Sequence, residues 1–388
     1  MPASTLPSAS PLWTRPTKPS SVIAPWAELT LTRNLADYPF PFCASDDELR
    51  ACETRILDAL EKAGLTSRGA YIAMGELSGV DQQQLVERRL ASEDLARRTG
   101  PRGVWVRDDQ GMSVMLNGTD HLTVRCTVSG RDAESAWQAI NQLDNLLSRL
   151  LDFAFDSRRG YLTSVLDNVG TGLRLRCLLH LPALNQADAL VKHAENAALH
   201  GMLLCGARRA GNTPGLPALT RGDAPAPPLS DWAVEHLHAD PDTAIFASGA
   251  QALGDLYMLC SHATLGRSEP ELVFALQHTA AELVAAEETA RAQLLGNGRI
   301  GVEDRVGRAI GVASRARLVG FEEGYALLSA LRLGAACHLP DTPAVDLLNE
   351  LLIGCQGAHL AHSLSGEPRS FALSEARAAR LRALYGAK

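Results

Sequence analysis

The period-two hydrophobic pattern of residues 103–126 most constrains the fold, because no helix can place such a pattern on one face. Three runs alternate apolar and polar residues: Gly103–Arg107, Met112–Leu116 and His121–Cys126. The connections at 108–111 and 117–118 carry Asp, Asn and Gly, the residue types that form tight turns. Short strands joined by tight turns pair antiparallel, so this segment predicts a β-meander.

Helical spacing of apolar residues surrounds the meander. Ser45 has the character of an N-cap, and three acidic residues follow it. The pattern predicts helices over four ranges before residue 265: Asp46–Lys62, Val80–Ala96, Ala133–Phe155 and Gln186–His200. Three further strands are predicted between and after them: Leu173–Leu181, Gly201–Gly206 and Ala252–Ser261.

Beyond Gly266 only the helical period is found. Five helices are predicted there: Glu269–Leu295, Glu303–Val312, Glu322–Leu333, Thr342–Ile353 and Leu373–Tyr385. The fold class is therefore α+β, with an antiparallel sheet and flanking helices in residues 23–265. An all-helical C-terminal domain is predicted to fill residues 266–388.

Two segments lack any period. Residues 1–22 are rich in Pro, Ser and Thr, and are predicted to be a disordered tail. Residues 207–242 are dense in Pro and Gly, and are predicted to be a long insertion loop.

Composition excludes several classes of function. The net charge of −7 argues against a nucleic-acid-binding or acidic-membrane surface. No apolar run approaches the roughly 20 residues of a membrane helix, and the N-terminus lacks a secretory signal, so a cytoplasmic protein is expected. The eight cysteines include no C-x-x-C pair, so reduced thiols and no metal site are predicted.

A glycine turn precedes an arginine in the stretch Asn168-Val-Gly-Thr-Gly-Leu-Arg174. Gly170 and Gly172 are predicted to take positive φ angles, which glycine adopts without strain. The turn would place Arg174 near the start of the strand Leu173–Leu181. An arginine there serves either an internal ion pair or a bound anion, and the sequence leaves both open.

At this point the chain resembles the ATP:guanido phosphotransferase (phosphagen kinase) superfamily, most closely the bacterial protein arginine kinases. Twelve segments carry the resemblance in order: Arg33–Pro41, Leu77–Arg88, Asp120–Leu122, Leu151–Asp156, Gly160–Thr163, Asn168–Arg174, Leu179–Ala183, Ala252–Leu256, Glu303–Val306, Ala316–Leu318, Leu331–Gly334 and Leu348–Leu351. The resemblance implies a phosphotransferase-like α/β domain followed by a helical dimerisation domain. It also implies five arginines that bind ATP phosphates and two acids near the guanidinium acceptor, with a cysteine there in many members.

Most of these implied positions are degenerate in this chain. Aligned on the matching strings, two arginine positions hold Glu28 and Thr30, and the third holds Thr123. One acid position holds Thr119, and the cysteine position holds Val165. A carboxylate at position 28 is expected to repel a triphosphate if it faces the cleft.

Of the five implied arginines, Arg174 alone is retained in its place. The fifth arginine position falls at Cys205 in one register and at Thr243 in another, with the second acid at Ser248. Arg208 and Arg209 are candidate displaced equivalents, and Arg125 and Arg176 are candidate substitutes on neighbouring strand positions.

Two hypotheses follow from the resemblance. In the first, the chain is a catalytically impaired pseudokinase that acts as a regulatory or interaction protein and needs no cofactor. In the alternative, it transfers the γ-phosphate of Mg-ATP to a protein arginine or a small guanidino compound through a remodelled site. That site would use Arg125, Arg174, Arg176, Arg208 and Arg209, and Asp120, Asp167 or Asp255 would orient the acceptor.

The resemblance also implies partners. A homodimer through the C-terminal helical domain is expected, together with a protein quality-control partner such as a Clp-type unfoldase. Neither nucleic acid nor a membrane is expected among the partners.

Overall fold

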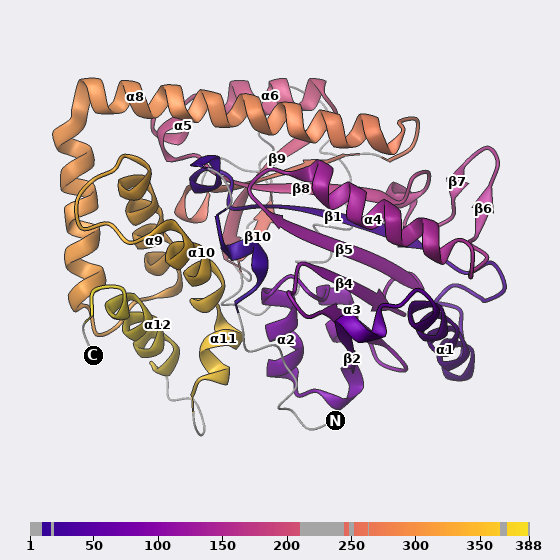
Figure 1. Cartoon of the computed structure of the whole chain (residues 1–388). Coiled ribbons are helices and arrows are strands. Elements are labelled where there is room, and N and C mark those ends of the chain that lie inside the picture. The colour runs from indigo at the N-terminus through magenta and orange to yellow at the C-terminus, as the bar shows by residue number, and fades with distance from the viewer. Residues whose placement is uncertain are drawn as a thin grey trace.

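A computed structural model describes residues 10–16, 19–209, 244–247, 252–262, 264–364 and 371–386. Its centre is a nine-stranded antiparallel sheet (Figure 1). From one edge to the other the strands are β10 (Ala244–Ala247), β9 (Met202–Arg209), β11 (Leu256–Ser261), β8 (Leu173–His180), β1 (Trp26–Arg33), β5 (Leu122–Ser129), β4 (Met112–Leu116), β3 (Gly103–Arg107) and β2 (Gly69–Ala73). The predicted meander is the β3–β4–β5 part of this sheet, with Gln110 and Asn117 at positive φ in its turns.

Helices cover the sheet and form the C-terminal half. In chain order they are α1 (Asp46–Lys62), α2 (Gly79–Glu87), α3 (Glu93–Arg97), α4 (Ala133–Leu147), α5 (Pro182–Gln186), α6 (Leu190–Leu199), α8 (Glu269–Arg315), α9 (Phe321–Ala336), α10 (Val345–Gly354), α11 (Gly357–His362) and α12 (Ala372–Ala383). A small hairpin, β6 (Phe155–Asp156) with β7 (Gly160–Tyr161), stands apart from the main sheet. The predicted α+β architecture is confirmed.

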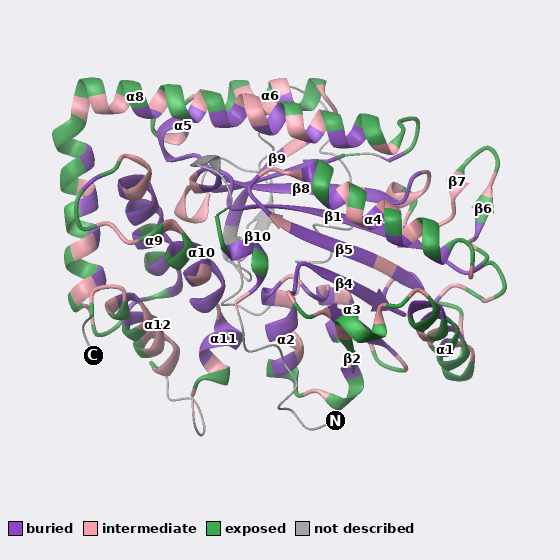
Figure 2. Cartoon of the chain, viewed as in Figure 1, coloured by how far each residue is buried: buried purple, intermediate pink, exposed green. Residues whose placement is uncertain are grey.

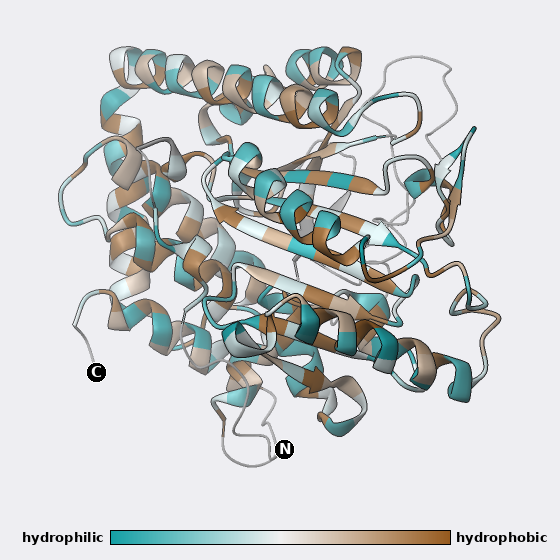
Figure 3. Ribbon diagram, turned by 45° about the vertical axis from the view of Figure 1, so that its right-hand side comes forward, coloured by the Kyte–Doolittle hydropathy of each residue, from teal (hydrophilic) through white to brown (hydrophobic). Residues whose placement is uncertain are grey.

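Strand β1 lies in the middle of the sheet and is buried along its whole length (Figure 2). Leu29 and Leu31 on one face belong to the main hydrophobic core, which the helices α1, α4 and α8 complete. The alternate residues Glu28, Thr30 and Thr32 point to the other face, because neighbouring side chains of a strand point to opposite sides. Figure 3 shows hydrophilic and hydrophobic segments following one another along strands of the sheet.

Several predicted helices differ in extent from the observed ones. The segment predicted as one helix over 80–96 is two helices, α2 and α3, because Arg89 adopts a φ of 64° between them. The two helices predicted over 269–295 and 303–312 are one, α8, which bends at Gly298, where φ and ψ leave the helical region (Figure 1). Glycine permits such a kink without ending the helix. The predicted N-cap of α1, Ser45, is observed, and it forms a capping box with Glu48.

The expected disordered tail over residues 1–22 does not hold for the described part, residues 10–16 and 19–22. Trp13 is buried edge-to-face against Trp26 of β1, with ring centroids 6.2 Å apart. The carbonyl of Thr14 accepts a hydrogen bond from Asn349 of α10, and that of Val22 accepts one from Arg332 of α9. The segment therefore joins the sheet to the helical half.

The predicted insertion over residues 207–242 begins inside β9, and from residue 210 on it lies outside the described residues. The predicted domain boundary after residue 265 falls in the turn that precedes α8. Among the described residues, none of the helices is long and apolar enough to cross a membrane.

Replacing Trp13 with alanine tests the role of the N-terminal segment. Because the ring is buried between β1 and the helical half, Trp13→Ala should lower the free energy of unfolding by about 3 kcal/mol. The matched control is Leu12→Ala, since the Leu12 side chain is about half exposed and should contribute within about 0.5 kcal/mol. Urea unfolding measures both, and equal effects would contradict this role.

Candidate functional site

Two rows of polar side chains cross the buried centre of the sheet. In the first row Thr30 of β1 lies between Arg125 of β5 and Arg174 of β8. In the second row, one repeat along, Glu28 lies between Thr127 and Arg176. Residues opposite one another in an antiparallel sheet have Cβ atoms about 5 Å apart, so each row brings its side chains into contact range.

A cavity of about 360 Å³ opens over these rows, within the size range of small-molecule sites. The sequence-predicted site residues in its lining are Thr30, Thr119, Asp120, Thr123, Arg125, Val165, Arg174 and Arg176. The lining also contains Asp94 and Arg97 from α3, which the sequence did not single out. The structure therefore gathers into one place most of the positions that the resemblance pointed to.

Glu28 does not face this cavity. Its side chain is fully buried behind the lining, where three arginines surround it: Arg89 at 2.8 Å, Arg176 at 3.3 Å and Arg125 at 3.7 Å, each from guanidinium nitrogen to carboxylate oxygen. We call these four residues the Glu28 cluster. The condition for the expected repulsion, that Glu28 faces the cleft, is therefore not met. The carboxylate instead binds arginines from inside the protein.

The charges of the Glu28 cluster hold the carboxylate ionised. Burial alone would raise the pKa of Glu28, but the guanidinium groups of Arg89, Arg125 and Arg176 outweigh burial and lower that pKa to about 2. Removing one member of a buried, paired set leaves an uncompensated charge and is strongly destabilising. The cluster is therefore a structural unit, whose arginines already have an anionic partner.

Arg89 is the member of the cluster that sequence reasoning missed. It follows α2, and its positive φ turns the chain so that its side chain reaches β1. There the guanidinium lies over the ring of Trp26, 3.7 Å from the centroid, while its Nε donates to Glu28. Nothing local in the sequence signals this contact, because the two partners are 61 residues apart.

Arg174 also has an internal partner. Its Nε donates to the Asn168 side chain at 2.6 Å, and its Nη2 lies 3.5 Å from a carboxylate oxygen of Asp167. Gly170 and Gly172 have φ angles of 116° and 68°, which confirms the predicted turn. A Cβ at residue 172 would come within 2.6 Å of the Thr32 carbonyl, so the turn also requires glycine for space. The turn thus holds Asn168 and Asp167 beside the arginine.

Arg97, the remaining arginine in the cavity lining, also has a carboxylate partner in the same chain. Arg97 pairs with Glu93, four residues earlier on α3, at 3.3 Å. Each of the four arginines that line the described cavity therefore has a carboxylate within 4 Å: Arg97 with Glu93, Arg125 and Arg176 with Glu28, and Arg174 with Asp167. Part of the positive charge of this wall is therefore offset from within, since Arg125 and Arg176 share Glu28 with Arg89.

The acidic candidates are bound to the framework. Asp120 accepts hydrogen bonds from the Asn34 side chain at 2.5 Å and the Ser164 backbone at 2.6 Å. Burial raises its pKa, against the effect of those hydrogen bonds. Asp167 lies beside Arg174, and Asp255 lies apart, paired with Arg305 of α8. Asp120 therefore lines the cavity, yet its carboxylate already positions the loop that follows β1.

His121 completes this loop contact. Its Nδ1 accepts a hydrogen bond from the Leu35 backbone, and its Nε2 lies 2.9 Å from the Pro39 carbonyl. The Nε2 must carry the proton in this arrangement, which describes a neutral ring. Burial lowers the pKa of His121 to about 4. The ring thus anchors residues 35–39 and is not presented to the cavity.

The implied thiol and fifth arginine are not rebuilt in the described lining. Val165 lines the cavity at the cysteine position, and no cysteine is among the described lining residues. Cys205 is buried on β9 beside Cys260 of β11 and is not among the described lining residues. Arg208 and Arg209 belong to β9, but their side chains, together with Thr243 and Ser248, lie outside what the structure describes.

The fold and the sequence agree with one known class. The chain matches the sequence model of the family described as ATP:guanido phosphotransferase, C-terminal catalytic domain, over residues 51–213. In solved structures the fold is similar to the duplicated taurocyamine kinase from Schistosoma mansoni, with a TM-score of 0.52 and 18% identity. That match covers 71% of this chain and spans about a third of the duplicated chain, 34% of it. Lombricine kinase gives a TM-score of 0.51 at 18% identity, over 70% of this chain and 67% of that one.

Relatives in sequence show to which family within this class the chain belongs. A protein-arginine kinase from Symbiobacterium thermophilum is 32% identical over 381 residues, which are 97% of this chain and 96% of that one. A protein-arginine kinase from Moorella thermoacetica is 34% identical over 380 residues, 96% of each chain. Residues 299–387 also match the family described as protein-arginine kinase McsB C-terminal domain. The chain therefore belongs to the protein-arginine kinase family of ATP:guanido phosphotransferases.

Neutralising Glu28 tests the Glu28 cluster. Glu28→Gln leaves three buried arginines without their carboxylate and should lower the free energy of unfolding at pH 7 by about 3 kcal/mol. Because the folded pKa of Glu28 is about 2 against 4.5 for an ordinary glutamate, its contribution is present above pH 4.5 and is lost as the pH falls toward 2.

Urea unfolding of the wild type and Glu28→Gln between pH 7 and 3 measures this difference. The gap between the two proteins should be constant down to about pH 4.5 and then shrink. The matched control is Glu61→Gln on the exposed surface of α1, which should change stability by no more than about 0.5 kcal/mol. A Glu28→Gln protein as stable as the wild type at pH 7 would show that the cluster contributes nothing.

Proposed function

We propose that this member of the family is catalytically impaired and acts as a regulatory or interaction protein. The observation that carries the proposal is the pairing of every arginine in the described cavity lining with a carboxylate of the same chain. Arginines of this kind bind a triphosphate when its phosphates serve as their anionic partner. Here each of these arginines already has a carboxylate of the same chain within 4 Å, with Glu28 shared between Arg125 and Arg176.

Electrostatics oppose the binding of a phosphate beside arginines that already pair with a carboxylate. Glu28 is part of the buried backbone framework of β1 and cannot leave when an anion arrives. A phosphate next to Arg125 or Arg176 would therefore share their positive charge with a fixed carboxylate. At short range in a medium of low dielectric, repulsion between two anions amounts to several kcal/mol, on the order of 4 kcal/mol at 4 Å. Pairing that stabilises the fold thus opposes binding of nucleotide phosphates.

On the acceptor side, two of the implied groups are replaced as well. Thr119 stands at one acid position and donates to Asp94, and Val165 stands at the cysteine position. Deprotonating or orienting a guanidinium calls for a carboxylate with lone pairs facing the substrate. Loss of a single electrostatic stabiliser commonly costs about 10²–10³ in rate, so losing several together supports an inactive site.

A working kinase with a remodelled site is the second candidate. What favours it is the cavity itself, which keeps the size of a ligand site and is lined by four arginines and two aspartates. In that case Mg-ATP would bind through Arg174 and Arg176, and Asp120 or Asp167 would orient a guanidinium. Arg208 and Arg209 would have to complete the phosphate contacts from the insertion.

Titration with Mg-ATP separates the two candidates. For the impaired protein we expect no change of Tm with saturating Mg-ATP and no phosphate transfer to free arginine or to an arginine-rich protein. A ligand present at a hundredfold its Kd would add about 2.7 kcal/mol of stability, which differential scanning fluorimetry detects readily.

Two comparisons make this test decisive. The Moorella thermoacetica relative, run in parallel, controls for nucleotide quality and assay conditions. Arg174→Ala in this chain should leave the absence of transfer unchanged. Transfer by the wild type that disappears in Arg174→Ala would establish the kinase and refute the impaired reading.

We further propose that the partners bind through the helical half. Support comes from apolar side chains that α8 and the segments after it leave exposed, among them Ile300, Val312, Leu318 and Leu347. A second copy of the chain is the first partner to test, by light scattering of the purified protein across a range of concentrations. By family resemblance, a protein quality-control unfoldase is the second.

A further inference from the structure

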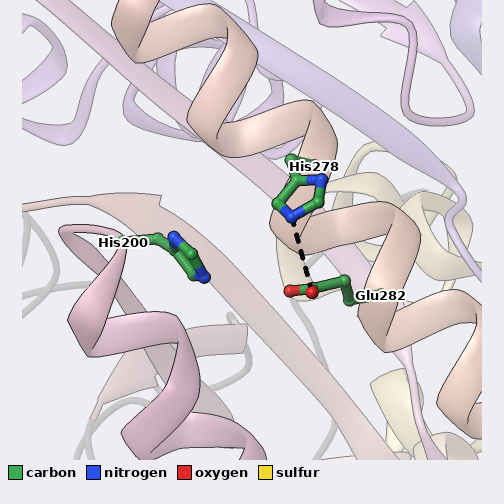
Figure 4. A group of neighbouring side chains, drawn as sticks. All are labelled: His200, His278 and Glu282. Atoms are coloured by element: carbon green, nitrogen blue, oxygen red, sulfur yellow. Dashed lines mark ion pairs between the residues drawn. The ribbon is translucent and has the colours of Figure 1, made fainter.

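Two histidines and a glutamate meet at the edge of the molecule, away from the cavity lining. His200 follows α6 at the turn into β9, and His278 and Glu282 lie one turn apart on α8. Figure 4 shows the His200 ring directed toward the space beside His278 and Glu282. Their ligand atoms, one from each side chain, all lie within 4.8 Å of one another.

The distances are close to those of a metal centre. Nε2 of His278 lies 3.4 Å from Oε1 of Glu282. Two ligands of a tetrahedral ion with bonds of about 2.0 Å are about 3.3 Å apart, so this pair already has the required separation. The rings of His200 and His278 are 5.7 Å apart between centroids and nearly perpendicular. A rotation of the half-exposed His200 side chain would bring a ring nitrogen close enough to bind the same ion as His278 and Glu282.

Neighbouring groups orient the three side chains. The Asn196 amide donates to Oε2 of Glu282 at 3.4 Å and leaves Oε1 turned toward His278. The ring of Phe274 stacks on that of His278, with centroids 5.8 Å apart. Nη1 of Arg267 donates to the His200 carbonyl at 2.8 Å and fixes the turn. Outer contacts of this kind set the direction of metal ligands in known sites.

We propose that His200, His278 and Glu282 form a binding site for a divalent transition-metal ion, with Zn²⁺ as the first ion to test. Two imidazoles and one carboxylate suit Zn²⁺, Ni²⁺ or Cu²⁺, whereas Ca²⁺ and Mg²⁺ prefer oxygen donors throughout. Three protein ligands leave at least one coordination position for water. The cysteine spacing predicted no metal site, but none of these three ligands is a cysteine.

The position of the site suggests what the ion does. His200 precedes β9, the strand that leads into the 207–242 insertion, while α8 lies across the sheet (Figure 1). A bound ion would fasten the turn between α6 and β9 to α8. It would therefore stabilise the folded protein in proportion to the logarithm of its concentration above Kd.

The test uses the untagged full chain with Zn²⁺ and with Co²⁺ as a spectroscopic probe. One equivalent of Zn²⁺ should bind and raise Tm, and Co²⁺ should show the visible absorption of a tetrahedral ion. Each of His200→Ala, His278→Ala and Glu282→Gln should weaken Zn²⁺ binding by at least about tenfold. All three side chains are at least partly exposed, so these variants should fold like the wild type in the absence of metal.

His362→Ala is the matched control, because His362 lies on α11 and pairs with Asp81 outside the proposed site. It should bind Zn²⁺ like the wild type. The titrations are repeated in a Cys43→Ser background, since Cys43 is an exposed thiol. Absence of stoichiometric binding, or binding that survives all three substitutions, would overturn the proposal.

Discussion

The architecture of the site depends on one buried carboxylate. Glu28 stands in the central strand of the sheet with no exposure to water, and an isolated charge there would be prohibitively unfavourable. The chain compensates with Arg176 from β8, Arg125 from β5 and Arg89 from the turn after α2. These contacts connect β1 to three other parts of the fold. They also affect the cavity in front, because two of its four lining arginines, Arg125 and Arg176, are held by Glu28.

The end of α2 and the turn after it, around residues 87–89, also connect the Glu28 cluster to the helical half. Glu87, at the end of α2, accepts hydrogen bonds from the backbone nitrogens of Ala358 and His359 at the start of α11. It also contacts Nδ1 of His359 at 2.6 Å, and burial lowers the pKa of His359 to about 3. Consecutive stretches around residues 87–89 thus bind α11 on one side and Glu28 on the other. These contacts link the helical half directly to the Glu28 cluster.

Sequence reasoning succeeded where the determinants are local. The meander, the Ser45 cap and the turn at Gly170 and Gly172 each depend on a few neighbouring residues, and all are observed. It failed where distant residues meet. Arg89 reaches Glu28 across 61 residues, and the buried Trp13 lies in a segment whose composition alone indicated disorder. The resemblance located the positions of the site, but whether Glu28 faces the cavity or the protein interior depends on partners that no spacing rule identifies.

The account therefore depends on whether the cavity can hold a chain of phosphates at all. Calorimetric titration with inorganic tripolyphosphate measures this without the contribution of a nucleoside or a metal ion. If the arginines are satisfied by Glu28, Asp167 and Glu93, the titration should show no saturable heat at millimolar ligand in low salt. Saturable binding that weakens strongly with added salt and is lost in both Arg174→Ala and Arg176→Ala would contradict the account.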